Sequence, residues 1–214
     1  MRKTYLLISL AVVLCHVANG QTILIPYGSA WKYLSNGSNQ GTAWRAAGFS
    51  DATWANGTAQ LGYGDGDEKT IVSYGANASN KYITSYFRKT ITIADTTMFK
   101  GYTINLKRDD GAVVYINGTE VFRSNMPTGT ISYTTLATAA ASDDGNTAQL
   151  KTLTISQLKK GTNVIAVEIH QDLVTTTDLS FDMELLATNI TASLARGPYL
   201  NMALQTGIVI RWRT

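Results

Sequence analysis

The sequence predicts an all-β protein, an antiparallel two-sheet β-sandwich of the jelly-roll class. Three observations predict this fold: short apolar segments alternate with polar positions, turn residues separate these segments, and no segment has the period of an amphipathic helix. About eight strands of this kind in one chain are typical of a sandwich. With 214 residues and 44% hydrophobic content, the chain can build a substantial core.

The clearest strand signals lie between Tyr102 and Met126. Ile104 and Leu106 alternate with polar residues, and a second apolar run leads into Asn117-Gly118. Asn-Gly between two alternating runs predicts a hairpin, because both residues accept the positive φ angles of a type I′ turn. We expect this stretch to form the middle of an antiparallel sheet.

The other elements follow the same reasoning in chain order. The aromatic residues Trp44, Phe49 and Trp54 lie in a segment that is too short and glycine-flanked for a long helix, so we expect one irregular turn that plugs the core edge. Polar or glycine-rich loops are expected at 35–42, 61–68, 75–80 and 127–146, the last over one end of the fold. Strands are expected at 22–26, 31–34, 82–94, 150–155, 164–170 and 179–186.

Residues 1–20 have the pattern of a secretory signal peptide. Arg2 and Lys3 precede an apolar run, and small residues follow before Gln21, the expected mature start. The run has roughly ten residues, whereas a spanning helix needs about 20. Lipid attachment at Cys15 is an alternative. We therefore expect a secreted protein, extracellular or periplasmic, without a membrane segment after cleavage.

Signal cleavage changes the charge and the cysteine count. Loss of Arg2 and Lys3 lowers the net charge from +3 to +1, and loss of Cys15 leaves no cysteine for a disulfide or a cysteine-metal site. The near-neutral chain has no basic stripe, so no nucleic-acid partner is expected. The glycine-acid segment 61–68 lacks the lysine of a phosphate-binding loop.

The polar segment 189–195 follows the last expected strand and is interpreted as a linker after a sandwich at 21–188. Residues 196–214 begin a new unit, whose alternating run IVIRWR predicts a single strand without a partner. Because one strand is not a domain, we expect a truncated second β domain and a longer polypeptide.

Residues 31–186 resemble galactose-binding-like jelly-roll modules, which precede or follow the catalytic domains of secreted bacterial hydrolases. The resemblance rests on the segments FSDATWANGTAQLGYGDGDE, SYFRKTITI, RDDGAVVYINGTEVFR, GTNVIAVEIHQ and DLSFDMEL. It implies a non-catalytic accessory module that binds a glycan or a cell-surface polymer. The alternative is a structural spacer that braces a downstream catalytic domain in the same polypeptide.

The motifs RGPYL and IVIRWRT in residues 196–214 resemble the start of the fibronectin-type domain in purple acid phosphatases and related metallophosphoesterases. The resemblance implies a phosphatase-like parent enzyme. That family binds two metal ions through aspartate, asparagine and histidine motifs that this sequence lacks. No catalytic residue and no catalytic metal site are therefore expected in this chain.

His170 is the one histidine after the signal peptide. It could act as a general base, but no serine or cysteine nucleophile motif accompanies it, and a triad or a histidine-rich metal site needs more. We interpret it as a strand-end histidine bonded to a nearby carboxylate such as Asp178.

Two acidic groups are candidate sites. Asp65, Asp67 and Glu68 lie in a glycine-rich loop, where oxygen ligands could converge on a structural calcium ion, although the spacing is not that of a twelve-residue calcium loop. Asp109 and Asp110 are adjacent and would point to opposite faces of a strand, so we interpret them as turn-capping residues rather than a glycosidase pair. Arg108 and Arg123 are expected to pair with them.

Exposed aromatic residues are the candidate carbohydrate contacts, because sugar-binding modules stack aromatic rings on pyranose rings. Trp44 and Trp54 have core-like neighbours. The predicted ligand-binding residues are Tyr63, Tyr74 and Tyr82, with Tyr133 also available.

Overall fold

The computed structural model describes residues 20–190, 199–204 and 207–211. The expected signal peptide and most of the expected linker lie outside these residues. Gln21–Asn189 forms one compact unit. Beyond it, β13 (Tyr199–Leu204) pairs antiparallel with β14 (Gly207–Arg211), so the region where one unpaired strand was expected contains a hairpin.

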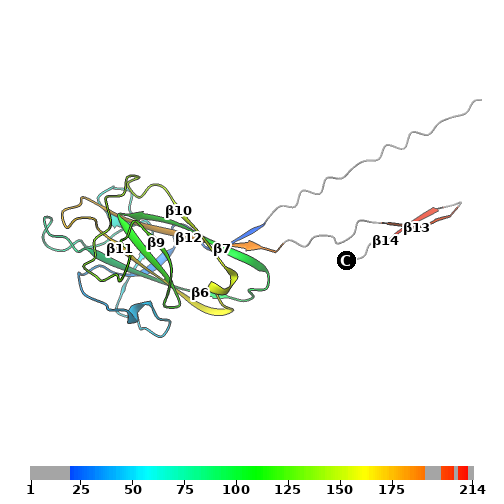
Figure 1. The fold of residues 1–214 in the computed structure, drawn as a ribbon, viewed down its shortest axis with the longest axis horizontal. Coiled ribbons are helices and arrows are strands. Elements are labelled where there is room, and N and C mark those ends of the chain that lie inside the picture. Colours follow the sequence, from blue (N-terminus) through cyan, green and yellow to red (C-terminus); the bar gives the residue numbers. More distant parts are fainter. Residues whose placement is uncertain (1–19, 191–198, 205–206, 212–214) are drawn as a thin grey trace, which may run out of the picture. The chain divides into compact units, whose positions relative to one another are not determined.

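The compact unit is a β-sandwich of two six-stranded sheets, as the alternating pattern predicts. Of the strands labelled in Figure 1, β7, β10 and β12 belong to one sheet and β6, β9 and β11 to the other. The first sheet has the order β10 (Gln149–Leu153), β7 (Phe99–Asp109), β12 (Leu179–Asn189), β4 (Leu61–Tyr63) and β5 (Thr70–Ile71), with β1 (Gln21–Ile25) also on β12. The second has the order β3 (Ala55–Thr58), β2 (Ala30–Leu34), β6 (Thr84–Ile93), β11 (Gly161–His170), β8 (Gly111–Ile116) and β9 (Thr119–Ser124).

Strand pairing is antiparallel throughout both sheets except between β4 and β5. From β6 onward the chain changes sheets at almost every connection: β7 returns to the first sheet, β8 and β9 to the second, β10 to the first, β11 to the second and β12 to the first. This alternation is the connectivity of the jelly-roll class.

The core lies between the two sheets. Phe181 on β12 and Phe87 on β6 stack across the layers with ring centroids 4.2 Å apart, and Trp31 on β2 meets Phe181 edge-on at 5.0 Å. Each fully buried aromatic or aliphatic side chain of this kind stabilises the fold by about 1.5–3 kcal/mol.

A second apolar cluster covers the outer face of the second sheet. Trp44, fully buried in the short 3-10 helix η1 (Ala43–Arg45), packs against Tyr86 and Tyr115, and Trp54 lies beside it. The expected one-turn segment and its core aromatics are thereby confirmed. Residues of 126–137 complete the cluster, so the polar stretch 127–146 packs in part on this sheet face rather than only over one end. Both faces of β11 are consequently buried.

The predicted hairpin at Asn117-Gly118 is confirmed, with φ angles of 51° and 89°. The prediction that Tyr102–Met126 forms the middle of one sheet was wrong. The chain crosses from the first sheet to the second at Asp110, and β9 forms an outer edge. Alternation reports which residues are buried and cannot report which sheet receives the strand.

Three short strands were not expected. β3, β4 and β5 are two to four residues long, and β4 lies in the segment predicted as a loop, where Leu61 and Tyr63 are buried. A second 3-10 helix, η2, spans Ile155–Gln157. Among the described residues, no helix has the length and apolar character needed to cross a membrane.

Candidate functional site

A hollow of about 310 Å³ lies beside Tyr82, between segments from distant parts of the chain. Gly37 and Gly75 flank the Tyr82 ring so closely that a Cβ atom would lie 2.5 Å from the ring at Gly37 and 3.0 Å at Gly75. The glycines therefore allow two loops to hold the half-buried ring. Tyr133 forms another wall, and its carbonyl accepts a 2.8 Å hydrogen bond from the Thr84 hydroxyl.

The structure places the three predicted tyrosines in different environments. Tyr82 lines the hollow, whereas Tyr63 is only 6% exposed and its hydroxyl accepts a hydrogen bond from the Gln171 amide. Burial raises the pKa of Tyr63. The Tyr63 ring packs against Tyr74, with 5.1 Å between ring centroids, so Tyr63 cannot present a face to a sugar and that assignment was wrong. Residues 61–68 were predicted as a loop from their glycines and acids, and β4 is only three residues long, too short for alternation to reveal it.

Tyr74 is partly exposed, but it does not line the hollow beside Tyr82. The Lys81 ammonium lies 5.6 Å from its ring centroid, and the same lysine donates a hydrogen bond to the Thr176 carbonyl. Tyr74 is therefore covered on one side by a cation–π contact. Of the three predicted residues, Tyr82 is the one that the fold brings to a cavity.

A second hollow of about 180 Å³ is lined by residues of some of the same segments. Segments 37–42 and 131–134 contribute residues to both hollows, and Tyr133 lines both. The second hollow reaches the buried carboxylate of Glu168, which accepts a 2.6 Å hydrogen bond from the Tyr115 hydroxyl. Arg45 Nη2 lies 3.3 Å from the same carboxylate. Sequence reasoning did not identify this pair, because its members are 123 residues apart.

His170, at the end of β11, is fully buried. Its Nδ1 lies 2.7 Å from the Thr135 carbonyl, which can only accept, so Nδ1 carries the proton. Its Nε2 lies 3.5 Å from the Glu168 carboxylate. The predicted carboxylate neighbour is thus Glu168 rather than Asp178, because Asp178 lies in the acidic cluster described next. These contacts tie the 131–135 segment to β11.

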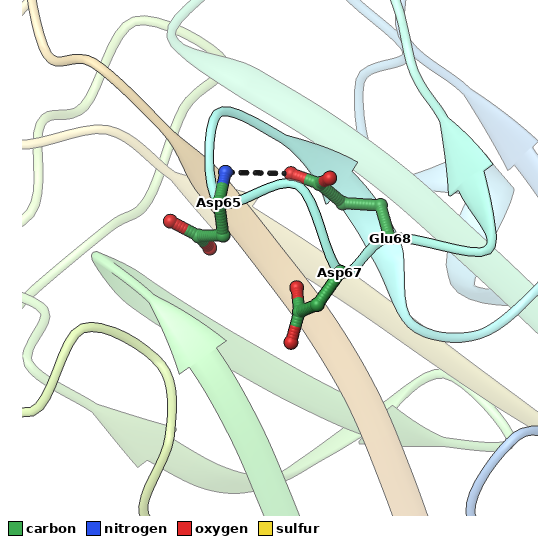
Figure 2. A group of neighbouring side chains, drawn as sticks. All are labelled: Asp65, Asp67 and Glu68. Atoms are coloured by element: carbon green, nitrogen blue, oxygen red, sulfur yellow. Dashed lines mark hydrogen bonds between the residues drawn. The ribbon is translucent and has the colours of Figure 1, made fainter.

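Acidic side chains gather beyond the end of β4. The carboxylates of Asp65, Asp67 and Glu68 lie within 4.8 Å of one another, as do those of Asp65, Asp144 and Asp178. Glu68 is already engaged, since its two oxygens accept hydrogen bonds of 2.9 Å from the amides of Asp65 and Gly66. Figure 2 shows Glu68 folded back toward the Asp65 amide while the Asp65 and Asp67 carboxylates point elsewhere.

In the second triad, Asp65 accepts one hydrogen bond from the Ser180 hydroxyl and Asp178 one from the Thr177 hydroxyl, each at 2.8 Å, so neither uses both oxygens as Glu68 does. Burial raises the pKa of Asp65, and a hydrogen bond with Asp178 raises the pKa of Asp144. Next to them, burial and the neighbouring Asp110 and Asp178 raise the pKa of Asp109 to about 9. Carboxylates this close disfavour one another's charged form, and a bound Ca²⁺ ion, which oxygen ligands of this type suit, would relieve that repulsion.

Asp109 and Asp110 were expected to cap a turn, but both are buried. The Asp110 carboxylate accepts hydrogen bonds from the backbone amides of Ala141 at 2.9 Å and Asp172 at 2.8 Å, so it joins two distant loops. The predicted arginine pairing was also wrong, because Arg108 pairs with Asp143 and Arg123 with Glu120.

No protein-family model matches the chain, and no curated protein matches it in sequence. Several solved structures match its fold. A β-glucuronidase from Bacteroides uniformis matches 78% of this chain with a TM-score of 0.51 and 18% identity, and one from Bifidobacterium dentium, complexed with coumarin-3-O-glucuronide, matches 81% with a TM-score of 0.51 and 11% identity. A β-glucuronidase of glycoside hydrolase family 2 matches 86% with a TM-score of 0.50 and 18% identity.

These matches show the fold. The sandwich has the architecture expected of a galactose-binding-like module, and each of the three solved chains contains a part with this fold. The matched parts cover between 18% and 31% of those chains, so this chain spans less than a third of their length. These three matches do not support the phosphatase-like parent implied by residues 196–214.

Proposed function

We propose that the sandwich is a non-catalytic, carbohydrate-binding accessory module of a larger secreted hydrolase. The observation that supports this most directly is the hollow beside Tyr82, where a half-buried ring, held by two loops, lies next to the partly exposed Tyr133. Tyrosine rings with nearby hydroxyl and amide groups suit the apolar faces and the hydroxyls of sugars. The similarity to parts of β-glucuronidases supports a carbohydrate-related setting.

Export and the parent enzyme belong to the same proposal. The leader-like residues 1–20 support secretion, and the resemblance of residues 196–214 supports a parent of the metallophosphoesterase type, while the fold matches are to glycoside hydrolases. Sequencing the gene beyond the codon for Thr214 tests this part. Metal-ligand motifs of a phosphoesterase downstream would support the phosphatase parent, and a glycosidase domain would replace it.

Glycan binding is expected to depend on Tyr82. In affinity electrophoresis against a panel of soluble polysaccharides, the chain should be retarded by at least one polymer, and Tyr82→Ala should weaken that retardation about tenfold, because stacking on an aromatic face is lost. Tyr27→Ala is the matched control. Tyr27 is another partly exposed tyrosine, with 37% of its surface accessible, and it lines neither hollow. Absence of retardation by every polymer would contradict the proposed function.

The spacer alternative is favoured by one observation. The outer face of the first sheet carries the apolar side chains of Ile23 and Leu150, which are more than half exposed, on strands β1 and β10. Such side chains could contact a neighbouring domain. A chain that binds no polysaccharide but protects these residues from solvent in the longer protein would favour this role.

We also propose a structural calcium ion at Asp65, Asp144 and Asp178, with Asp67 nearby, in place of the predicted set that includes Glu68. Calcium at a hundredfold excess over its Kd should stabilise the fold by about 2.7 kcal/mol, and chelator should reverse the gain. The gain should be smaller near about pH 5 than near pH 8, because the raised pKa values of Asp65 and Asp144 let protons compete with the ion.

Calorimetric melting with calcium and then with chelator checks this expectation. Asp178→Asn should abolish the calcium-dependent shift, whereas Asp95→Asn, an exposed acid outside the cluster, should retain it. Identical melting curves with calcium and with chelator would rule out the ion.

A further inference from the structure

The hollow of about 180 Å³ is lined by Arg45, a hydrogen-bond donor, and Glu168, an acceptor, which form an ion pair. The Glu168 side chain is 2% exposed and that of Arg45 is 16% exposed, and they meet at 3.3 Å. A guanidinium has five N–H donors, and the hydrogen bond to Glu168 uses one of them, so Arg45 can still donate to a ligand in the hollow that it lines.

Neighbouring groups hold both members of the pair in place. The Arg45 guanidinium lies 4.1 Å from the ring centroid of Tyr115, and the Tyr115 hydroxyl holds the Glu168 carboxylate at 2.6 Å. These two contacts fix the position of the carboxylate relative to the guanidinium. A preorganised donor and acceptor of this kind bind a ligand without the cost of ordering flexible side chains.

The walls of the hollow add aromatic and polar surface. Tyr86 and Tyr133 line it, and Asn39, Thr42 and Ser132 bring amide and hydroxyl groups to its rim. At about 180 Å³ the space is small. It fits a single ring-sized group better than a bulky one.

We propose that this hollow binds an uncharged sugar ring through two adjacent hydroxyl groups, one donating to Glu168 and the other accepting from Arg45. The inference rests on the proposed glycan-binding function and specifies the class of sugar. A hydroxyl pair matches both members of the ion pair at once, which a single charged group cannot do.

Charge excludes the other sugar classes. A uronate carboxylate that reached Arg45 would come close to the buried Glu168 carboxylate, and an amino sugar that reached Glu168 would approach the guanidinium. Like charges in a site of low dielectric repel strongly. The module should therefore bind neutral polysaccharides in preference to polyuronates.

Isothermal titration of the full chain with soluble β-glucan and galactomannan, compared with polygalacturonate, tests the inference. Neutral polymer should bind at least about tenfold more tightly than polygalacturonate, and Arg45→Gln should reduce that affinity about tenfold or more, because a charge-assisted hydrogen bond is lost. Thr42→Tyr, which fills the hollow from an exposed position and leaves both members of the ion pair in the sequence, should have a similar effect even if Arg45→Gln folds poorly. Lys160→Gln, an exposed charge distant from both hollows, should bind like the unmodified chain.

The outcomes separate the two proposals. Neutral-polymer binding that survives both Arg45→Gln and Thr42→Tyr, or a preference for polygalacturonate, would overturn the inference and leave the glycan-binding function standing. Failure of every polymer to bind the unmodified chain would overturn both.

Discussion

Arg88→Ala is expected to destabilise the sandwich by about 3 kcal/mol, near the lower end of the cost of breaking a buried ion pair, because its partner Asp51 is 27% exposed. Arg88 lies on β6 and is 2% exposed. Its Nε donates to Asp51 at 2.9 Å, and its Nη atoms donate to the carbonyls of Trp44, Ala46 and Phe49. Removing the guanidinium would leave three carbonyls and one carboxylate with fewer donors, and such losses are costly when they are buried.

Urea unfolding measures this loss. Arg88→Lys should recover little of it, because an ammonium cannot reach several acceptors with the planar geometry of a guanidinium. Lys151→Ala, at an exposed position on β10, should change the unfolding free energy by less than about 0.5 kcal/mol. An Arg88→Ala variant as stable as this control would show that the 43–51 segment is not held by Arg88. Because Arg45 lies in that segment, the same variant should also lose affinity for neutral glycans.

Gly62→Ala is expected to destabilise the fold by at least about 1–3 kcal/mol, the usual cost of forcing extra volume into a packed site. A Cβ atom at Gly62 would lie 1.9 Å from the Leu179 carbonyl oxygen, a backbone atom that cannot move without displacing β12. The pairing of β4 with β12 would therefore have to open. Since β4 leads into the acidic loop, the variant should also respond less to calcium.

Gly48→Ala is the matched control. A Cβ atom at Gly48 would meet no heavy atom within 4 Å, so the same chemical change should be neutral or slightly stabilising. Thermal unfolding of the two variants under identical conditions compares them. Equal melting temperatures would contradict the close packing of β4 on β12.

The candidate sites differ in how far sequence could predict them. The acidic loop was visible because Asp65, Asp67 and Glu68 are close in sequence, but the second triad adds Asp144 and Asp178, which lie more than 70 residues further along the chain. Tyr82 was one of three predicted tyrosines. It differs from the buried Tyr63 in its surroundings, because Gly37 and Gly75 pack against its ring beside a hollow, and the sequence does not show this packing. Aromatic composition alone does not distinguish a core ring from a surface ring.

The secondary structure class, the hairpin at Asn117-Gly118 and the burial of Trp44 could be predicted from the sequence, because alternation, turn chemistry and apolar size act locally. The entry of β7 and β8 into different sheets, and the contact of Arg45 with Glu168 across 123 positions, could be seen only in the folded chain. These are contacts between distant segments. They depend on which sheet each strand joins after a loop, and the local spacing of residues within a strand does not specify that choice.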